Sequence, residues 1–507
     1  MRMRARSLRA HKPASYVDNL PDEILREILL RTLPRQFFEM ELFVSPLQSI
    51  ALPVRLSHVS RRWRGISLST GELWTYLSLV VNESTCTAKQ SRKLIKIFDV
   101  FLERTGRCPL NFRLDCRLSN KETIKAGHHI MSIFLTQQHR WKDVNFLWQG
   151  LNPSHGFRGL QMNDMPLLRT FVVDISICTA EGAPIYPKLD LEKSRQLEAL
   201  VVRNGIALEF GKTPKYRLSK CAVNIPLKYM NIVSWRICRD ILRNSPNLQS
   251  LDFRTDPHVD SPSLESGEES MLLHRGLKML DLRYGLCSEF VIDGLCLPAL
   301  KELYYVDGSL AAGGNKLLRF VQRSEPALTS FAFHGTHIQD TMLVKVLRHL
   351  PTITQLALLS CPLNASFIRA FEIPNDTECP PAASKDDVSV LCPRLRSLRI
   401  SCSSLYQSFE LPFVAALNLM IESRRRSLNT LNKVTIHATP RRVEYYAPLG
   451  REEIGHLKSC LESGRLVYID SVEESPFSVA QAEGLRRMKE ARESNTSRVN
   501  RWRNLRS

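Results

Sequence analysis

A short phrase with the pattern x-x-L-x-x-L-x-Φ, where Φ is an apolar residue, recurs along most of this chain of 507 residues. Its first leucine-like positions are Leu168, Leu197, Leu248, Leu277, Leu300, Leu328, Ile353 and Leu395. Most intervals between these positions are 23 to 29 residues, close to the length of one unit of a stacked repeat. One such unit cannot bury its own apolar face, so neighbouring units must share a continuous core.

Segments with helical apolar spacing lie between the phrases, as in "WRICRDILRNSP", "KLLRFVQRSEP" and "DTMLVKVLRHLP". Each ends at a proline, which predicts a helix that stops before a short strand, and Asp340 is the expected N-cap of the last one. A helix, a proline stop and a strand form the unit of a leucine-rich repeat. We predict an α/β fold, an irregular leucine-rich-repeat solenoid or horseshoe with parallel strands. A generic α/β fold with parallel strands is the alternative.

Two intervals are longer than one unit. The 51 residues between Leu197 and Leu248 predict a hidden unit at "PLKYMNI", near Pro226. The 42 residues between Ile353 and Leu395 predict one unit with an inserted loop near 375–387.

Alternation along each predicted strand places leucines inside and their neighbours on the concave face. Mixed charge with an aromatic side chain suits protein recognition, although solvated strand residues would show the same pattern. The candidate substrate-binding residues are Asp252, Arg254, Asp281, Arg283, Glu302, Tyr304, His334 and Arg399.

The segment "LPDEILREILL" predicts a short amphipathic helix, because Pro21 suits the first helical position. Glu27 and Arg31 are spaced for an ion pair on its flank. Its apolar stripe is Ile24, Leu25, Ile28 and Leu29. Such a stripe must be buried against the rest of the chain or against another protein.

The segment "VRLSHVSRRWRGIS", residues 54–67, predicts a second helix. Its apolar positions Leu56, Val59, Trp63 and Ile66 fall on one face. The phrase "GELW" follows and adds a further large aromatic residue, Trp74.

The order L-P-x-E-I-L-x-x-I-L, a gap, V-S-x-x-W-R-x-I and then L-W resembles an F-box. Ser60 stands where this family usually has a cysteine, and the gap from Pro34 to Pro53 is longer than in compact members. The phrase "FLERTGRCPLNFRL", Phe101 to Leu114, resembles the segment that follows the F-box in fungal members. The alternative is that these helices only cap the larger domain.

In the F-box family, this motif binds the Skp-type adaptor of a cullin–RING ubiquitin ligase. The resemblance therefore implies a substrate-recognition subunit of an SCF-type E3 ligase, whose repeats bind an unknown substrate protein. The adaptor-binding residues that it implies are Leu20, Pro21, Ile24, Leu25, Ile28, Leu29, Leu56, Val59 and Trp63. We expect no enzyme activity of its own, no cofactor, no metal, no membrane, and a cytoplasmic or nuclear location.

The expected domains are a basic disordered tail (1–15), the F-box (16–80), a helical linker with the first repeat (81–120), the solenoid (121–475) and a basic helical or disordered tail (476–507). Net charge is +19, of which +5 lies in residues 1–12 and +5 in residues 481–507. Three interpretations are open for such tails: solvated or nuclear-import segments, segments that contact nucleic acid, and, for the N-terminal tail, a mitochondrial transit peptide. A non-ligase scaffold at chromatin through these tails is the second hypothesis, although nucleic acid is not the expected partner.

Other chemistry is absent from the sequence. No apolar run approaches the roughly 18 residues of a membrane span. The 13 cysteines include no C-x-x-C pair, which favours buried free thiols. The phrase "GSLAAGGNK" lacks the lysine spacing of a phosphate loop and predicts a turn before a helix, and the adjacent His128 and His129 would make a poor chelate.

Overall fold

The computed structural model describes residues 16–33, 46–82, 88–151, 161–178, 188–203, 206–210, 215–225, 233–255, 271–283, 288–307, 313–335, 338–361, 363–373, 390–402, 411–427, 431–438 and a few positions between 455 and 469. The chain forms two compact units, Met1–Tyr216 and Arg217–Ser507. Each unit is described by itself.

The first unit begins with short helices. They are η1 (Tyr16–Asn19), α1 (Asp22–Arg31), α2 (Pro46–Ser57), α3 (Arg61–Ser69) and η3 (Gly71–Trp74). Pro21 is the N-cap of α1, one residue before the first helical position that was expected for it. The expected Glu27–Arg31 ion pair is confirmed at 3.1 Å. The predicted single helix over 54–67 is wrong, because α2 ends at Ser57 and α3 begins at Arg61. The Ser60 side chain accepts a hydrogen bond from the Trp63 backbone N–H, which caps a new helix there.

Parallel strands and two longer helices follow in the first unit. They are β1 (Tyr76–Val81), α4 (Ala88–Thr105), β2 (Leu110–Leu118), α5 (Lys121–Thr136), η4 (Gln138–Arg140), β3 (Trp141–Leu151), β5 (Thr170–Cys178) and β7 (Ala199–Arg203). A small sheet contains β4 (Gln161–Met162), β6 (Lys188–Asp190) and β8 (Ala207–Glu209). The range 16–80, which was expected to be all helical, thus ends in a strand, and the parallel strands start before residue 121.

Parallel strands alternate with helices along most of the described part of the second unit. Its main strands, in spatial order, are β9 (Lys220–Ile225), β10 (Ser250–Thr255), β12 (Met279–Arg283), β14 (Glu302–Asp307), β15 (Ser330–Gly335), β16 (Gln355–Leu359), β17 (Ser397–Cys402), β18 (Lys433–Ala438) and β19 (Leu466–Ile469). Its helices are α6 (Val233–Asn244), α7 (Ser288–Asp293), α8 (Gly313–Ser324), α9 (Asp340–Arg348), α10 (Ala365–Arg369) and α11 (Leu411–Ser427). The short strands β11 (Leu272–Leu273) and β13 (Leu295–Cys296) pair with each other.

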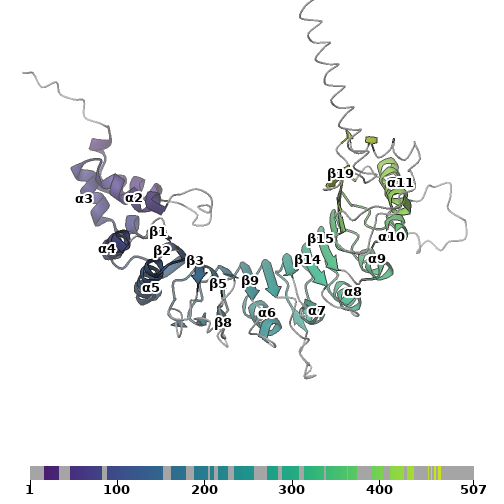
Figure 1. Cartoon of the computed structure of the whole chain (residues 1–507), viewed down its shortest axis with the longest axis horizontal. Coiled ribbons are helices and arrows are strands. Elements are labelled where there is room, and N and C mark those ends of the chain that lie inside the picture. Colours follow the sequence, from purple (N-terminus) through teal and green to yellow (C-terminus); the bar gives the residue numbers. More distant parts are fainter. Residues whose placement is uncertain are drawn as a thin grey trace, which may run out of the picture. The chain divides into compact units, whose positions relative to one another are not determined.

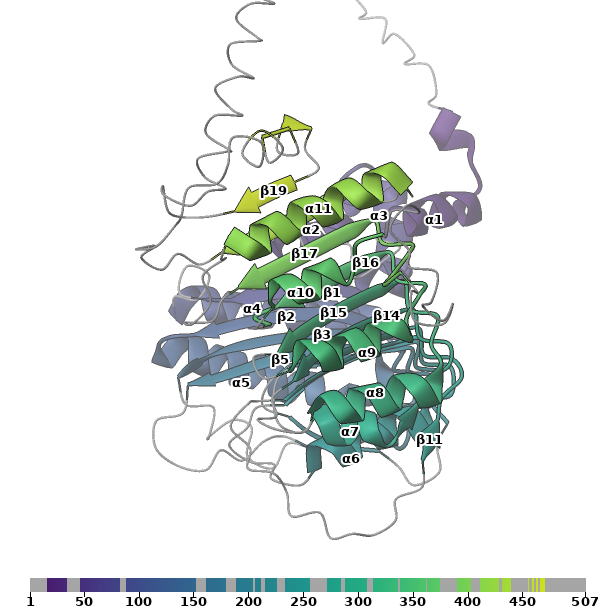
Figure 2. The ribbon, with the colours of Figure 1, turned by 90° about the vertical axis from the view of Figure 1, so that its right-hand side faces the viewer.

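Successive helices of the second unit, α6 to α9, lie along one side of its strands (Figures 1 and 2). The strands alternate buried and part-exposed residues, as in the pattern of β15, so that the buried side chains face the core. All eight leucine-like positions of the repeat phrase are fully buried. The mixed α/β architecture with a parallel sheet is therefore consistent with a leucine-rich-repeat-like solenoid.

The hidden unit differs from its predicted position. Leu218 is fully buried and precedes β9, so the phrase "YRLSKCAVNI" supplies this repeat. The segment "PLKYMNI" near Pro226 lies outside the described residues, as do the polar insertion at 375–387 and both basic tails. Asp340 is the first helical residue of α9 and not its N-cap, which is Gln339.

Arginine side chains of the second unit, one buried and one partly exposed, satisfy backbone carbonyl groups between successive repeats. The Arg424 side chain of α11 is fully buried and donates hydrogen bonds to the carbonyls of Phe371, Leu391 and Cys392. Cys392 has a positive φ of 48°, a strained backbone conformation that this contact helps to hold. Arg323 of α8 similarly donates to the carbonyls of Ile292 and Leu295 at 2.9 Å each.

We expect Arg424→Met to lower the free energy of unfolding by about 3 kcal/mol, because three buried carbonyls lose a charged donor. Arg425→Met is the matched control, since Arg425 is exposed and forms only a 3.8 Å ion pair with Glu422. Urea unfolding followed by circular dichroism measures both. Equal losses of unfolding free energy in the two variants would contradict the stabilising role given to the hydrogen bonds of Arg424.

Candidate functional site

Two surfaces contain the residues predicted from the sequence, one in each unit. The first is the helical segment from η1 to α3. Its exposed apolar side chains are Val17, Ile24, Ile28, Val54, Val59 and Leu68. Among the predicted adaptor-binding residues, Ile24 is 49% exposed, Ile28 42% and Val59 60%.

The apolar stripe of α1 divides into an inner and an outer half. Leu25 and Leu29 are each only 1% exposed and belong to the core of the first unit. Ile24 and Ile28 are one helical turn apart, so they share one outward face. The single broad stripe of the sequence therefore supplies both the packing of α1 and an apolar surface that the described part of this chain leaves uncovered.

Ion pairs hold α1 against its neighbours and fix which face points outward. Arg62 of α3 donates to the Asp22 carboxylate at 2.7 Å and also to the Leu20 carbonyl. Arg26 pairs with Glu72 of η3 at 2.6 Å. These contacts use the polar flanks of α1, so its exposed isoleucines keep a defined orientation.

Trp74, and not Trp63, forms the aromatic centre of this segment. Its ring is fully buried, and its indole N–H donates to the Ser67 carbonyl at 2.7 Å. The Arg104 guanidinium lies 4.2 Å from the Trp74 ring centroid. Of the remaining predicted residues, Pro21 is exposed, and Leu20, Leu56 and Trp63 are partly exposed.

The second surface is the face of the sheet opposite to the buried leucines in the second unit. Parallel pairing in register places Asp252 beside Asp281, Asp281 beside Tyr304, and Arg254 beside Arg283. Further along, Tyr304 is followed across the sheet by Ala332, Ala357 and then Arg399. The strands thus bring most of the predicted substrate-binding residues into adjacent rows.

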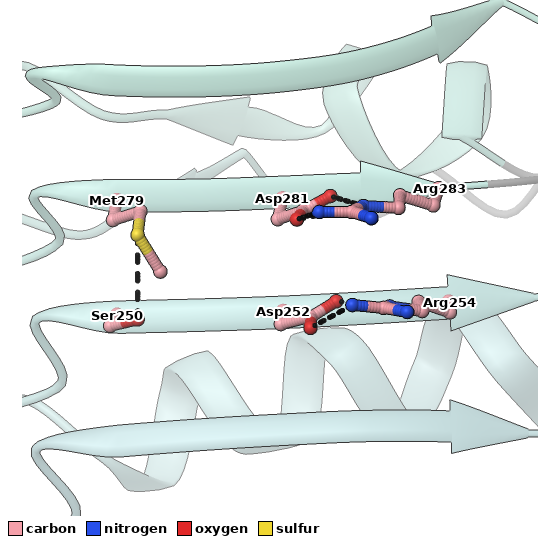
Figure 3. Close-up of polar contacts among 6 residues, drawn as sticks. All are labelled: Ser250, Asp252, Arg254, Met279, Asp281 and Arg283. Carbon is pink, nitrogen blue, oxygen red and sulfur yellow. Dashed lines mark hydrogen bonds and ion pairs between the residues drawn. The ribbon is translucent and has the colours of Figure 1, made fainter. Parts of the chain in front are cut away.

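Two Asp-x-Arg ion pairs dominate this face (Figure 3). Arg254 donates to the Asp252 carboxylate at 2.9 and 3.0 Å, and Arg283 donates to Asp281 at 2.6 to 2.9 Å. Burial raises the pKa of the Asp281 carboxyl, and the hydrogen bonds from Arg283 offset part of that rise. Each pair is formed within one strand, so both charges are neutralised locally.

The other predicted residues of this face differ in their surroundings. The Arg283 guanidinium lies 4.5 Å from the Tyr304 ring centroid, a cation–π contact that orients the ring. His334 of β15 is half-buried, and burial lowers the pKa of its imidazole. Glu302 and Arg399 are exposed. Because Ala332 and Ala357 separate Tyr304 from Arg399, those two side chains lie on different parts of the face.

One member of the Asp-x-Arg pattern escaped the sequence analysis. In the first unit, Arg117 lies 3.4 Å from Asp115 on β2, and the Asp115 side chain is buried. The signal was present in the sequence, because "LDCR", "LDFR" and "LDLR" share one spacing. The strand β2 lies in the range 81–120, where a helical linker with the first repeat was expected, but outside the eight repeat phrases.

Cysteines and histidines contribute no site among the described residues. The expected buried thiols include Cys116, Cys221, Cys238, Cys361 and Cys392, and burial raises the pKa of Cys238 to about 12. His128 stacks on Trp148 at 5.9 Å, while His129 is exposed. The described residues include no cluster suited to a metal ion, and none of their helices is long and apolar enough to span a membrane.

No family model and no curated protein matches the chain. Among solved structures, the crystal structure of a TLR13–ssRNA13 complex matches with a TM-score of 0.29 and 16% sequence identity. That match covers 59% of this chain and 43% of the other, so this chain spans less than half of that protein. A likeness of this size carries no argument about fold or function.

The environment of Arg283 predicts a measurable asymmetry between the two ion pairs. We expect Arg283→Met to lower the free energy of unfolding by about 2 kcal/mol, because the partly buried Asp281 loses its partner and Tyr304 loses its cation. Arg254→Met should cost less than about 1 kcal/mol, since Asp252 is more exposed. Urea denaturation measures both, and equal losses would refute the asymmetry.

His334 should titrate below the ordinary histidine pKa of 6.5, because burial disfavours the imidazolium. The folded state therefore loses stability as pH falls through 6.5, where the unfolded chain takes up the proton more readily. NMR titration of the His334 ring measures the pKa. A weaker loss of stability in His334→Gln at low pH supports this origin, whereas a pKa at or above 6.5 rules it out.

Proposed function

We propose that this chain is a substrate-recognition subunit of an SCF-type cullin–RING ubiquitin ligase, which binds a Skp-type adaptor through its N-terminal helices. The repeats bind the substrate protein, and the ubiquitin transfer takes place on other subunits. The chain contributes proximity, because a bound substrate lysine meets activated ubiquitin at high effective concentration.

The exposure of Ile24 and Ile28 on α1 carries this proposal. Two isoleucines one turn apart on an outward helix face expose apolar area that a partner helix or groove would cover favourably. They belong to the L-P-x-E-I-L-x-x-I-L phrase that resembles the F-box. In this proposal Ile24, Ile28 and Val59 contact the adaptor, while Leu25 and Leu29 support α1 from inside.

The sheet face of the second unit supports the receptor half of the proposal. It presents an aromatic side chain fixed by a cation–π contact, together with charged side chains on neighbouring strands. Tyrosine and arginine are common anchors of protein interfaces, and a preoriented ring loses little rotamer freedom on binding.

We expect the double substitution Ile24→Asp and Ile28→Asp to weaken binding of a purified Skp-type adaptor by roughly a hundredfold, because two desolvated apolar contacts become charged. Isothermal titration with the full chain measures the dissociation constant. Thermal unfolding should stay close to that of the unsubstituted chain, since both residues are exposed.

Leu419→Asp is the control, because Leu419 lies on α11 in the second unit and is 55% exposed. It should leave adaptor binding unchanged. Leu25→Asp is a poor test of adaptor binding, since a charge at this buried position would unfold α1. Adaptor binding that survives the double substitution, or that is equally lost in the control, would refute the proposal.

A further inference from the structure

The starts of the parallel strands in the second unit carry an excess of positive charge. The segments that lead into β9, β10, β12, β14, β15, β16, β17 and β18 are residues 217–220, 245–250, 274–279, 297–302, 325–330, 350–355, 392–397 and 431–433. Their lysines and arginines, which we name the basic edge, are Arg217, Lys220, Arg275, Lys278, Lys301, Arg394, Arg396 and Lys433. All eight are exposed, and the only acidic residues in these segments are Glu302 and Glu325.

A ladder of backbone hydrogen bonds arranges these residues in a row. The Lys278 N–H donates to the Gln249 carbonyl, and the Lys301 N–H donates to the Lys278 carbonyl, each at 2.8 Å. The same step repeats through Thr329 and Thr354 to the Arg396 N–H. The strand starts at the left of Figure 3, where Ser250 and Met279 lie, show two steps of this edge. Neighbouring strands are about 4.8 Å apart, so the edge extends over about 34 Å.

The cations of the basic edge lack carboxylate partners among the described residues. None of the eight forms an ion pair, and the Lys278 ammonium contacts only the neutral amide oxygen of Gln249, at 3.3 Å. By contrast, Arg254 and Arg283 on the adjoining sheet face are both neutralised within their own strands. The fold thus pairs Arg254 and Arg283 on the face and leaves the charges of the edge available.

Stabilisation of helix ends explains only part of this charge. Helices α6, α8 and α9 end just before strands of this edge, and cations near helix C-termini are favourable. Their last turns already contain Arg243, Arg323 and Arg348, respectively. Lys220, Lys278 and Lys301, in contrast, lie at strand starts.

We propose that the basic edge binds an acidic, extended segment of a partner protein. An extended chain advances about 3.3 Å per residue, so about ten residues would follow the edge from β9 to β18. Aspartate and glutamate side chains would meet the cations at both ends of the row. In its middle, at β15 and β16, the strand starts present Ser330, Thr354 and Gln355, which suit hydrogen bonds to a peptide backbone.

The composition of the edge favours a peptide over a nucleic acid. Single-stranded nucleic acid is usually bound by a basic groove together with aromatic side chains on which bases stack. The segments of this edge expose no Phe, Tyr or Trp side chain. The ammonium and guanidinium groups are therefore the main recognition elements, and carboxylates are matched to them.

Calling this partner a substrate rests on the proposed function, but binding of an acidic segment does not. Adaptor binding involves α1 in the first unit, whereas the basic edge belongs to the second. When adaptor binding and acidic-peptide binding are measured on the same preparation, a failure of the proposed function can be told apart from a failure of the basic-edge proposal.

The test is fluorescence anisotropy of the full chain with a labelled glutamate-rich peptide of about ten residues, long enough for the edge. The same peptide with glutamine in place of glutamate, and an oligothymidylate of equal charge, serve as comparison probes. The edge variant combines Lys278→Glu, Lys301→Glu and Arg396→Glu. The matched control combines Lys96→Glu, Lys125→Glu and Lys345→Glu, which are exposed on helices and change the net charge equally.

We expect salt-sensitive binding of the acidic peptide, a loss of roughly tenfold or more in the edge variant, and little change in the control variant. A glutamine version of the edge variant should show a smaller loss, and it replaces the glutamate version if that variant fails to fold. Equal losses in the edge and control variants, equal binding of the glutamine peptide, or tighter binding of the oligothymidylate would each overturn the proposal.

Discussion

Parallel pairing of strands in register is the constraint on which the rest of this structure depends. Because each strand takes its place from the backbone of the one before, a residue at one position of a repeat is stacked on its counterparts in the neighbouring repeats. In the second unit this stacking buries the leucine-like positions in one continuous core. The same stacking places Asp252 beside Asp281 and Arg254 beside Arg283, a juxtaposition of like charges that has to be balanced locally.

Balance is reached within each strand and not between strands. An arginine two residues after an aspartate projects on the same face, so the side chains meet without leaving their own strand. The pairs at Asp252 and Asp281 therefore neutralise two rows of like charge that in-register pairing would otherwise build up. At the strand starts no acidic residue lies two positions before or after Lys278 or Lys301, so no carboxylate of the same strand projects beside these lysines and their charge stays uncompensated. One topological rule thus produces two neutralised Asp–Arg pairs on the face and a positive edge.

The sequence predicted the repeat core well, because a buried leucine is fixed by periodicity alone. It placed the hidden unit wrongly, since "PLKYMNI" begins with a proline as several repeat phrases do, whereas "YRLSKCAVNI", whose buried position is Leu218, has Cys221 where the second leucine is expected. It also joined α2 and α3 into one helix, because Leu56, Val59, Trp63 and Ile66 keep helical spacing across the break that Ser60 caps. Apolar periodicity shows which residues share a face, but a helix can end and a new one begin at a capping residue without any change in the apolar spacing.

The candidate sites could be predicted only in part for a similar reason. Alternation identified the residues of the sheet face, but it could not show that Arg254 and Arg283 are already paired. Likewise, the stripe of α1 was visible as one apolar group, whereas only tertiary packing divides it into buried leucines and exposed isoleucines. Which half of a stripe is available depends on neighbours that are distant in sequence, here Arg62 and Glu72.

Arg424 has a further consequence for how such a chain can change over time. Its guanidinium joins the Phe371 carbonyl to those of Leu391 and Cys392, so two ends of a chain insertion are anchored to the same helix. The entropic cost of closing a chain segment between two fixed ends grows only slowly with its length. With both ends anchored, residues can be gained or lost between them while β16 and β17 keep their register. A buried arginine of this kind would let an irregular repeat array vary the length of the chain between two repeats without disturbing its core.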